Sequence, residues 1–236
     1  MIAPAPLIRK GAASVRRKAV ILLSGGLDSA VALFLAKKKG YECHCLAFDY
    51  GQRHKVELGR ARRLARKAGS KLRVFKLKFP WKGSSLLDKK TVLPTGRSIS
   101  EIKKSVPSTY VPARNTIFLG IAASFAEAIG ATDIFIGAHF EDSSGYPDCR
   151  AGYLKAFDKV MALGTKAASE DGLRLRFPLI DKDKGQIIKL GHSLKVPFRL
   201  TWSCYRGGKR PCGSCDSCVL RAKGFKEAGL EDPLYE

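Results

Sequence analysis

The sequence predicts an α/β protein with a doubly wound, mainly parallel sheet and a small C-terminal metal-binding lobe. Apolar, strand-like runs alternate with helical patterns along most of the chain, as in parallel sheets covered by helices. A glycine turn follows the first apolar run, and four cysteines cluster near the C-terminus. We expect a flexible basic lead-in over 1–17, an α/β domain over 18–200 and a four-cysteine lobe over 201–236.

The composition indicates a globular protein of a reducing compartment. Hydrophobic residues make up 45% of the 236 residues, which is ordinary for a folded domain. No apolar run approaches the roughly 20 residues that span a bilayer, and the N-terminus lacks a long apolar signal segment. Seven cysteines, four of them clustered, favour a metal site over a disulfide scaffold. We therefore expect a cytoplasmic protein with no membrane partner.

The net charge of +22 permits binding to nucleic acid or to acidic small molecules such as ATP. Basic residues are densest from Arg53 to Lys78, where Ala61, Leu64 and Ala65 recur at helical spacing. We interpret this stretch as a helix with a solvated basic face, slightly in preference to an RNA-binding surface. A nucleic-acid partner is therefore not required.

The first predicted strand, Val20–Leu23, leads into a Ser-Gly-Gly turn and then a helix. Backbone N–H groups at such a turn, together with the positive end of the helix, form a site for a polyanion. Gly25 and Gly26 allow phosphates to approach the backbone closely. Ser24 and Ser29 can donate hydroxyl hydrogen bonds.

Asp28 fits a phosphate site only if it is a ligand of Mg²⁺. The alternative for this stretch is a helix cap, in which Asp28 or Ser29 satisfies the amides of the first turn.

The other predicted elements alternate in type along the chain, and the helix after the first turn ends before Gly40. Strands are expected at 42–48, 71–77, 133–137 and within 174–180, with helices at 30–39, up to 68, 115–129, 153–168 and 184–194. Loops 49–54 and 138–150 then lie at the carboxyl edge of the sheet, where ligands bind in such folds. The irregular stretch 79–112 is expected to cover a substrate, and a plain mobile loop is the alternative.

Four cysteines near the C-terminus have the spacing of a metal site. Thiolates separated by seven, two and two residues can surround one tetrahedral Zn²⁺, and an all-cysteine site is structural. An iron–sulfur cluster is the alternative metal group, and a chance grouping of reduced thiols is the third reading. The four residues are Cys204, Cys212, Cys215 and Cys218.

Two further stretches carry groups suited to a substrate. Arg114 begins the buried helix, where its guanidinium can bind a carboxylate or phosphate, or form an ion pair at the helix entry. The stretch His139–Arg150 combines carboxylates, an aromatic ring and an arginine, which a guanine-like base would need, although an ordinary acidic loop looks similar. Cys149 lacks a clear base partner and is interpreted as a lining residue. His54 is interpreted as ordering its loop rather than transferring protons.

The motif SGGLDS resembles the pyrophosphate loop of the N-type ATP pyrophosphatases, which split ATP between its α- and β-phosphates. DYGQRH, YVPARNTIFL, SGYPDCR, LGTK and SCYRGGKRPCGSCDSC follow in order, and together they resemble the 7-cyano-7-deazaguanine synthases from about Lys18 to the C-terminus. Ala113 stands where that family is expected to have glycine. His139-Phe140-Glu141 is a looser match.

This resemblance implies an adenine-nucleotide α-hydrolase-like fold and a ligase that forms C–N bonds. The implied reaction converts 7-carboxy-7-deazaguanine, ATP and ammonia to 7-cyano-7-deazaguanine, a precursor of queuosine and archaeosine, through an acyl-adenylate and an amide. It also implies a homodimer, one structural Zn²⁺ per chain and Mg²⁺. A tRNA-modifying enzyme of the same fold, for example a thiolase, and a basic zinc-ribbon RNA-binding protein are the alternatives.

The resemblance also implies roles for individual residues. Asp28, Ser24 and Lys166 are the expected catalytic residues, with Lys166 as a phosphate clamp. The ATP site is expected to consist of Leu22, Leu23, Ser24, Gly25, Gly26, Leu27, Asp28, Ser29, Ala30 and Val31. The substrate is expected to contact Arg114, Tyr146, Asp148 and Arg150.

Overall fold

The computed structural model describes residues 16–235 except 82, 89, 103–105 and 171, so most of the expected lead-in lies outside the described residues. Within the described part, five parallel strands form one sheet in the order β3-β2-β1-β4-β5. They are β1 (Lys18–Leu22), β2 (Glu42–Asp49), β3 (Lys71–Lys76), β4 (Asp133–Phe135) and β5 (Arg174–Arg176). The predicted doubly wound parallel sheet is confirmed.

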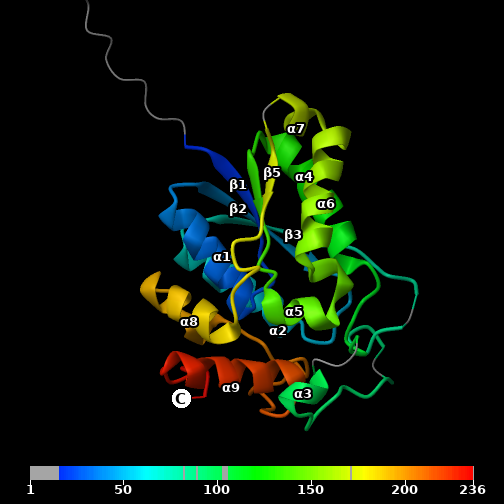
Figure 1. Ribbon diagram of the computed structural model, residues 1–236, viewed down its shortest axis with the longest axis vertical. Coiled ribbons are helices and arrows are strands. Elements are labelled where there is room, and N and C mark those ends of the chain that lie inside the picture. Colours follow the sequence, from blue (N-terminus) through cyan, green and yellow to red (C-terminus); the bar gives the residue numbers. More distant parts are fainter. Residues whose placement is uncertain (1–15, 82, 89, 103–105, 171, 236) are drawn as a thin grey trace, which may run out of the picture.

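Helices cover both faces of the sheet (Figure 1). The helices are α1 (Leu27–Lys38), α2 (Val56–Lys67), α3 (Ile99–Ile102), α4 (Arg114–Ile129), α5 (Phe140–Gly145), α6 (Ala151–Gly164), α7 (Lys166–Glu170), α8 (Lys184–Ser193) and α9 (Asp216–Ala228). Two 3₁₀ turns lie at Pro147–Cys149 and Phe198–Leu200. On one face α1, α2 and α8 pack together, and on the other face lie α4 and α6.

Two hydrophobic clusters follow from the alternation of side chains along the strands. In β1, Ile21 faces α1, α2 and α8, whereas its neighbours Val20 and Leu22 face α4 and α6. Cys43 and Cys45, two residues apart in β2, share the first of these faces. Both clusters are closed by helices, which explains why the central strands are apolar on both sides.

The strand order reverses between β1 and β4, because the chain runs from β1 outward to β3 and then returns to the other side of β1. Ligands bind at such a switch point, beyond the carboxyl ends of the strands. At Gly137 a Cβ atom would lie 2.8 Å from the backbone of Asp28 and Ser29. Glycine is therefore needed where the end of β4 meets the start of α1.

Several predicted element boundaries were wrong in instructive ways. α1 begins at Leu27, so Asp28 and Ser29 belong to its first turn. The helix expected at 153–168 is two helices, because Thr165 has an extended backbone and its hydroxyl accepts the N–H of Ala168. The expected loops 79–112 and 138–150 contain the short helices α3 and α5.

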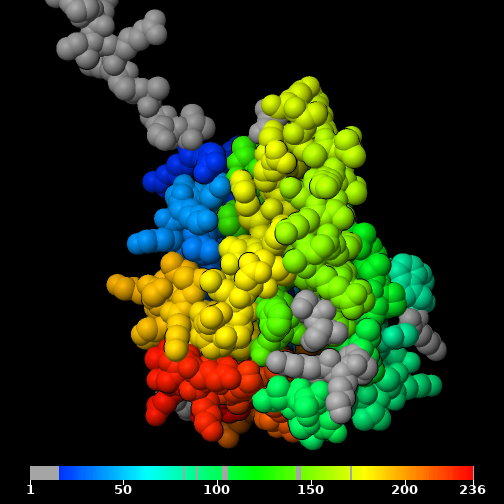
Figure 2. Space-filling view, viewed as in Figure 1, coloured from blue at the N-terminus to red at the C-terminus, as the bar shows by residue number. Residues whose placement is uncertain are grey.

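The C-terminal segment lies across the base of the molecule, where the strands end. Figure 2 shows α9, in red, beside α8 and the green segment that contains α3. At Gly224 on α9, a Cβ would clash with the side chain of Lys184 on α8, so the two helices pack unusually closely. Among the described residues, no helix is long and apolar enough to span a bilayer.

Ala113, which replaces an expected glycine, has a left-handed backbone with φ of +50°. This conformation costs a residue with a Cβ about 1–2 kcal/mol, and glycine adopts it freely. Ala113 is exposed and immediately precedes α4. The structure thus explains why glycine is suited to this position.

We expect Ala113→Gly to raise the free energy of unfolding by up to about 1 kcal/mol. The backbone strain relieved in the folded state contributes more free energy than glycine's extra conformational entropy gives to the unfolded chain. Urea denaturation measures the change. The control is Ala156→Gly on an exposed position inside α6, which should lower stability by about 1 kcal/mol. Equal destabilisation by both changes would contradict the strain at residue 113.

Candidate active site

A cavity of about 280 Å³ lies beyond the carboxyl ends of the strands. It extends from the glycine turn, through the aromatic residues at the end of β2, to the start of α4. The C-terminal segment contributes a further wall that includes Trp202 and Tyr205. Segments far apart in the sequence therefore enclose one space at the switch point of the sheet.

The glycine turn at one end of the cavity is rigidly placed. Gly25 has φ of +95°, and a Cβ there would clash with the carbonyl oxygen of Glu57 in the first turn of α2. From the other side, the N–H of Trp202 donates to the carbonyl of Gly25 at 2.9 Å. Gly26 is the N-cap of α1 and offers no side chain to cap the first amides. The turn thus has the geometry of an anion-binding site.

The two serines of the turn are hydrogen bonded to each other. Ser24 Oγ and Ser29 Oγ lie 3.1 Å apart, and Ser29 also donates to the carbonyl of Gly26 at 3.0 Å. Ser24 is exposed, whereas Ser29 is buried. Both hydroxyls therefore lie at the helix N-terminus, as the sequence predicted.

Asp28 is part of a charged cluster at the switch point. Lys184 Nζ donates to its Oδ1 at 2.8 Å, and His139 Nε2 lies 2.8 Å from the same ammonium group. Burial raises the pKa of Asp28, but the charges of Lys184 and His139 outweigh this and the net pKa is below its usual value. Asp28 is therefore a carboxylate, with its side chain still 26% exposed. Such a group can bind Mg²⁺ together with substrate phosphates.

Lys184 is the important residue that sequence reasoning missed. Its side chain is 9% exposed and lines the cavity, although a lysine is rarely buried without a partner. The available signal was its position at the start of a helix, on the same face as Ile187, Ile188 and Gly191, which are buried. A lysine on a buried helix face indicates a functional cation.

Lys166, the predicted phosphate clamp, lies elsewhere. It begins α7, its side chain is 75% exposed, and its ammonium lies 3.7 Å from Glu170. The neighbouring Ala167 accepts a hydrogen bond from Leu173, just before β5 begins. Since parallel strands start at one edge of the sheet and the cavity lies at the other, this chain does not bring Lys166 to the glycine turn.

Arg114 lies at the other end of the cavity, without a carboxylate partner among the described residues. Its Nη1 donates to the hydroxyl of Tyr50 at 3.1 Å, and its guanidinium lies over the rings of Tyr50 and Phe118. Its Nε is buried and has no hydrogen-bond acceptor in the part of the chain that the structure describes. Burial lowers the pKa of Arg114, but Tyr50, Cys149 and Asp148 raise it by more, and the net pKa is above its usual value. The group is therefore a cation. These contacts argue against the helix-entry ion pair and favour an anionic ligand.

The other three predicted substrate residues are placed differently. Tyr146 lines the cavity, and its hydroxyl lies 2.7 Å from Thr109 Oγ1 and 3.5 Å from the hydroxyl of Tyr205. Asp148 is outside the lining, because its carboxylate accepts the N–H of Asn115 at 2.9 Å and caps α4. Arg150 is exposed at the start of α6 and is also outside the lining. Of these three, the structure brings only Tyr146 to the cavity.

Part of the stretch 79–112 covers the cavity, as expected, since Leu86, Ile102 and Pro107 line it. This stretch is attached to the cysteine segment by a bridge between Thr95 and Cys215 and by an Arg97–Asp216 ion pair. This stretch, which we call the cover, and the four-cysteine segment therefore support each other.

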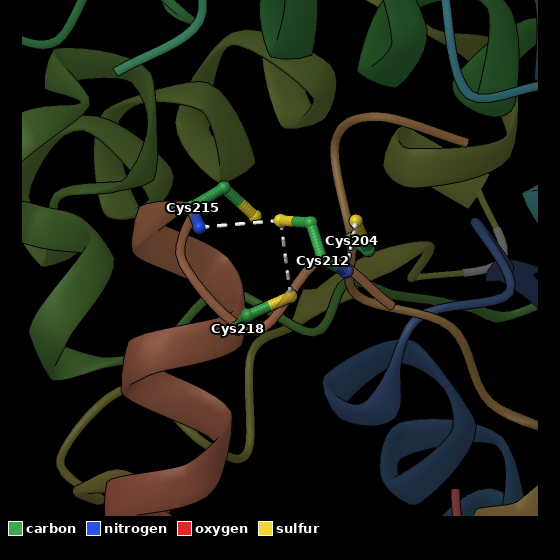
Figure 3. Close-up of side chains that lie close together, drawn as sticks. All are labelled: Cys204, Cys212, Cys215 and Cys218. Carbon is green, nitrogen blue, oxygen red and sulfur yellow. Dashed lines mark hydrogen bonds between the residues drawn. The ribbon is translucent and has the colours of Figure 1, made fainter. Parts of the chain in front are cut away.

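The four predicted metal ligands converge (Figure 3). The sulfur atoms of Cys204, Cys212, Cys215 and Cys218 all lie within 4.8 Å of one another. A tetrahedral Zn²⁺ with bonds of about 2.3 Å needs sulfur atoms about 3.8 Å apart. Backbone N–H groups of Cys212 and Cys215 point to sulfur atoms at 3.3 Å, an arrangement that stabilises thiolates. The cluster fits a single tetrahedral metal ion.

The family model described as "Queuosine biosynthesis protein QueC" matches residues 18–229. The chain belongs to the QueC family. It is 50% identical to the 7-cyano-7-deazaguanine synthase of Thermoplasma acidophilum, over 94% of this chain and 93% of the relative. It is 52% identical to that of Nostoc punctiforme, over 92% of this chain and 98% of the relative. The predicted family is confirmed.

Solved structures with a similar fold are more distant. NMN synthetase from Francisella tularensis is similar with 18% identity and a TM-score of 0.48, over 92% of this chain and 79% of that chain.

We expect Lys184→Gln to reduce the rate of 7-cyano-7-deazaguanine formation at least about 100-fold, because a preorganised cation is lost beside the glycine turn. The matched control is Lys166→Gln, which removes the sequence-predicted lysine and should retain most of the rate. Product formation is followed by chromatography, with thermal unfolding to confirm folding. A larger loss of rate in Lys166→Gln than in Lys184→Gln would instead make Lys166 the lysine of the phosphate site.

Proposed function

We propose that this QueC-family chain converts 7-carboxy-7-deazaguanine, ATP and ammonia to 7-cyano-7-deazaguanine. The observation that carries this proposal is one cavity that connects an uncapped glycine turn to Arg114, a cation without a carboxylate partner in the described part of the chain. One end suits the phosphates of ATP, and the other suits a substrate carboxylate. The activity named for the curated relatives supports the same conclusion.

We assign the phosphates of ATP to the turn around Ser24 and to the first turn of α1. Lys184 adds a positive charge where the leaving pyrophosphate would develop negative charge. Asp28 is suited to hold Mg²⁺, because one carboxylate and substrate phosphates are a common magnesium ligand set. The ion would supply charge neutralisation of the phosphates.

The substrate is proposed to lie between the turn and α4. Arg114 would hold its carboxylate near the α-phosphate, while Tyr50, Phe118 and Tyr146 offer aromatic faces for the fused rings. Asp148 and Arg150 would then act indirectly, since Asp148 fixes the helix turn that carries Arg114. Glu141 lines the cavity and Asp148 does not, so the Glu141 carboxylate is better placed to hydrogen bond to the deazaguanine base.

The reaction needs an activated carboxyl group, because oxide is a very poor leaving group. A carboxylate oxygen attacks the α-phosphorus and pyrophosphate leaves with the electron pair of the broken P–O bond. Ammonia then displaces AMP to form an amide. A second ATP adenylates the amide oxygen, with release of pyrophosphate and one N–H proton. Loss of AMP and the second N–H proton then forms the nitrile. The protein contributes mainly positioning and charge stabilisation.

We also propose one structural Zn²⁺ in the four-cysteine lobe at 201–236. The closely spaced sulfur atoms support one ion rather than an iron–sulfur cluster, in which the cysteine sulfurs lie farther apart. The lobe would hold Trp202 against the glycine turn and Asp216 against Arg97.

A cytoplasmic homodimer remains the proposed assembly, without a required nucleic-acid partner.

The proposed reaction predicts pyrophosphate release with 7-carboxy-7-deazaguanine and ammonia, and none with tRNA as the acceptor. Asp28→Asn should abolish release while the fold remains, because the variant loses the charge that binds Mg²⁺. A coupled pyrophosphate assay and circular dichroism provide the readouts. Turnover that depended on tRNA would instead support the tRNA-modifying alternative.

We expect Cys215→Ser to lower both zinc content and melting temperature, since a four-thiolate site contributes directly to folding. The control is Cys45→Ser, which changes another fully buried cysteine, far from the quartet, and should leave zinc content unchanged. Metal analysis and a visible absorption spectrum check the assignment. Iron in the purified protein, with a visible absorption band, would contradict zinc.

A further inference from the structure

His54 and Glu57 form a buried pair in the wall of the cavity. His54 follows β2 in the loop that leads to α2, it is 3% exposed, and both residues line the cavity. His54 Nε2 lies 3.1 Å from Glu57 Oε2. The arrangement matches that of a histidine oriented by a carboxylate.

The pair determines which nitrogen of the ring carries the proton. A carboxylate can only accept, so in its neutral form the imidazole donates from Nε2 to Glu57 and leaves a lone pair on Nδ1. Nδ1 is buried and has no hydrogen-bond partner among the described residues. A buried polar atom without a partner is costly unless a ligand or substrate supplies one. Nδ1 is therefore an unsatisfied acceptor in the wall of the cavity.

The pair is adjacent to the glycine turn. The carbonyl of Glu57 occupies the space that a side chain at Gly25 would need, and the N–H of Glu57 donates to the carbonyl of His54 at 3.1 Å. On the other side, the ring of Tyr205 lies 6.0 Å from that of His54, and Gly207 packs against the His54 backbone. The imidazole thus lies between the turn and the cysteine segment.

The proposed reaction has a proton to remove at this place. Ammonia in neutral water is mainly ammonium, which has no lone pair and cannot attack an acyl carbon. Of the described histidines, His54 lines the cavity, whereas His139 is hydrogen bonded to Lys184 and to the N–H of Glu141. The position and the free lone pair of His54 suit it to this step.

We propose that His54, oriented by Glu57, accepts a proton from ammonium at Nδ1. This inference rests on the proposed function. One N–H bond of ammonium breaks, its electron pair stays on nitrogen, and the proton moves to the imidazole, whose charge Glu57 offsets. The nitrogen pair then forms the C–N bond, and AMP leaves with the electron pair of the broken C–O bond. The N-protonated amide that results loses its extra proton to water. The imidazolium afterwards releases its proton to water.

A change of nucleophile tests this role. Hydroxylamine is largely unprotonated at neutral pH, so it needs no base before it attacks the acyl-adenylate to form a hydroxamate. For His54→Gln we expect the rate of amide formation from ammonium chloride to fall about 100-fold. Hydroxamate formation should fall less than about 3-fold, which corresponds to a small part of the general-base contribution. Single-turnover reactions analysed by mass spectrometry give both rates.

Two further variants complete the experiment. His44→Gln is the matched control, because His44 also pairs with a glutamate, Glu42, at 3.0 Å but lies outside the cavity lining. The rates of amide and hydroxamate formation should both be unchanged in this variant. Glu57→Gln keeps an acceptor for Nε2 but loses the charge, so ammonium-dependent amide formation should fall selectively, about 10-fold. It also provides the test if His54→Gln does not fold.

The results separate the inference from the proposed function. Equal losses with both nucleophiles, or no loss with ammonium, would overturn the role of His54. If wild-type protein released no pyrophosphate with 7-carboxy-7-deazaguanine, the proposed function itself would fail, whatever the variants did.

Discussion

The contact between Lys184 and Asp28 is the interaction on which the site depends. It joins the starts of α8 and α1, which are 156 residues apart in the sequence, through a hydrogen bond of 2.8 Å. Two glycines make it possible, since Gly137 lets β4 approach Asp28 and Gly224 leaves space for the Lys184 side chain. Removing either charge would leave its partner without its nearest counter-charge in a mostly buried place, which lowers stability.

This contact also explains why remote segments converge on one cavity. α8 is packed against α9, whose N-cap is Cys215 and whose first turn contains Cys218, so the cysteine cluster and Lys184 belong to one packed unit. The same segment holds Trp202 on the glycine turn and pairs Asp216 with Arg97 of the cover. In this arrangement the proposed zinc site shapes the active site without taking part in the chemistry.

Features set by a local sequence pattern could be predicted from the sequence. The positions of side chains that depend on packing between distant segments could not. The strand, glycine turn and helix are adjacent in the chain, and the cysteine spacing alone indicated a metal site. Lys184 was missed because its partner is remote, although its place on a buried helix face was a visible signal. Asp148 looked like a substrate carboxylate because a sequence does not show that it caps α4. Lys166 was misplaced because a break at Thr165 puts it beside the start of β5.

The central claim is that one cavity brings the substrate carboxylate to the α-phosphate of ATP. The most direct measurement uses 7-carboxy-7-deazaguanine with oxygen-18 in its carboxylate, together with ATP and ammonia, and mass spectrometry of the products. Attack on the α-phosphorus predicts that the label appears in AMP and that pyrophosphate stays unlabelled. Label in inorganic phosphate, with ADP as the nucleotide product, would contradict the account.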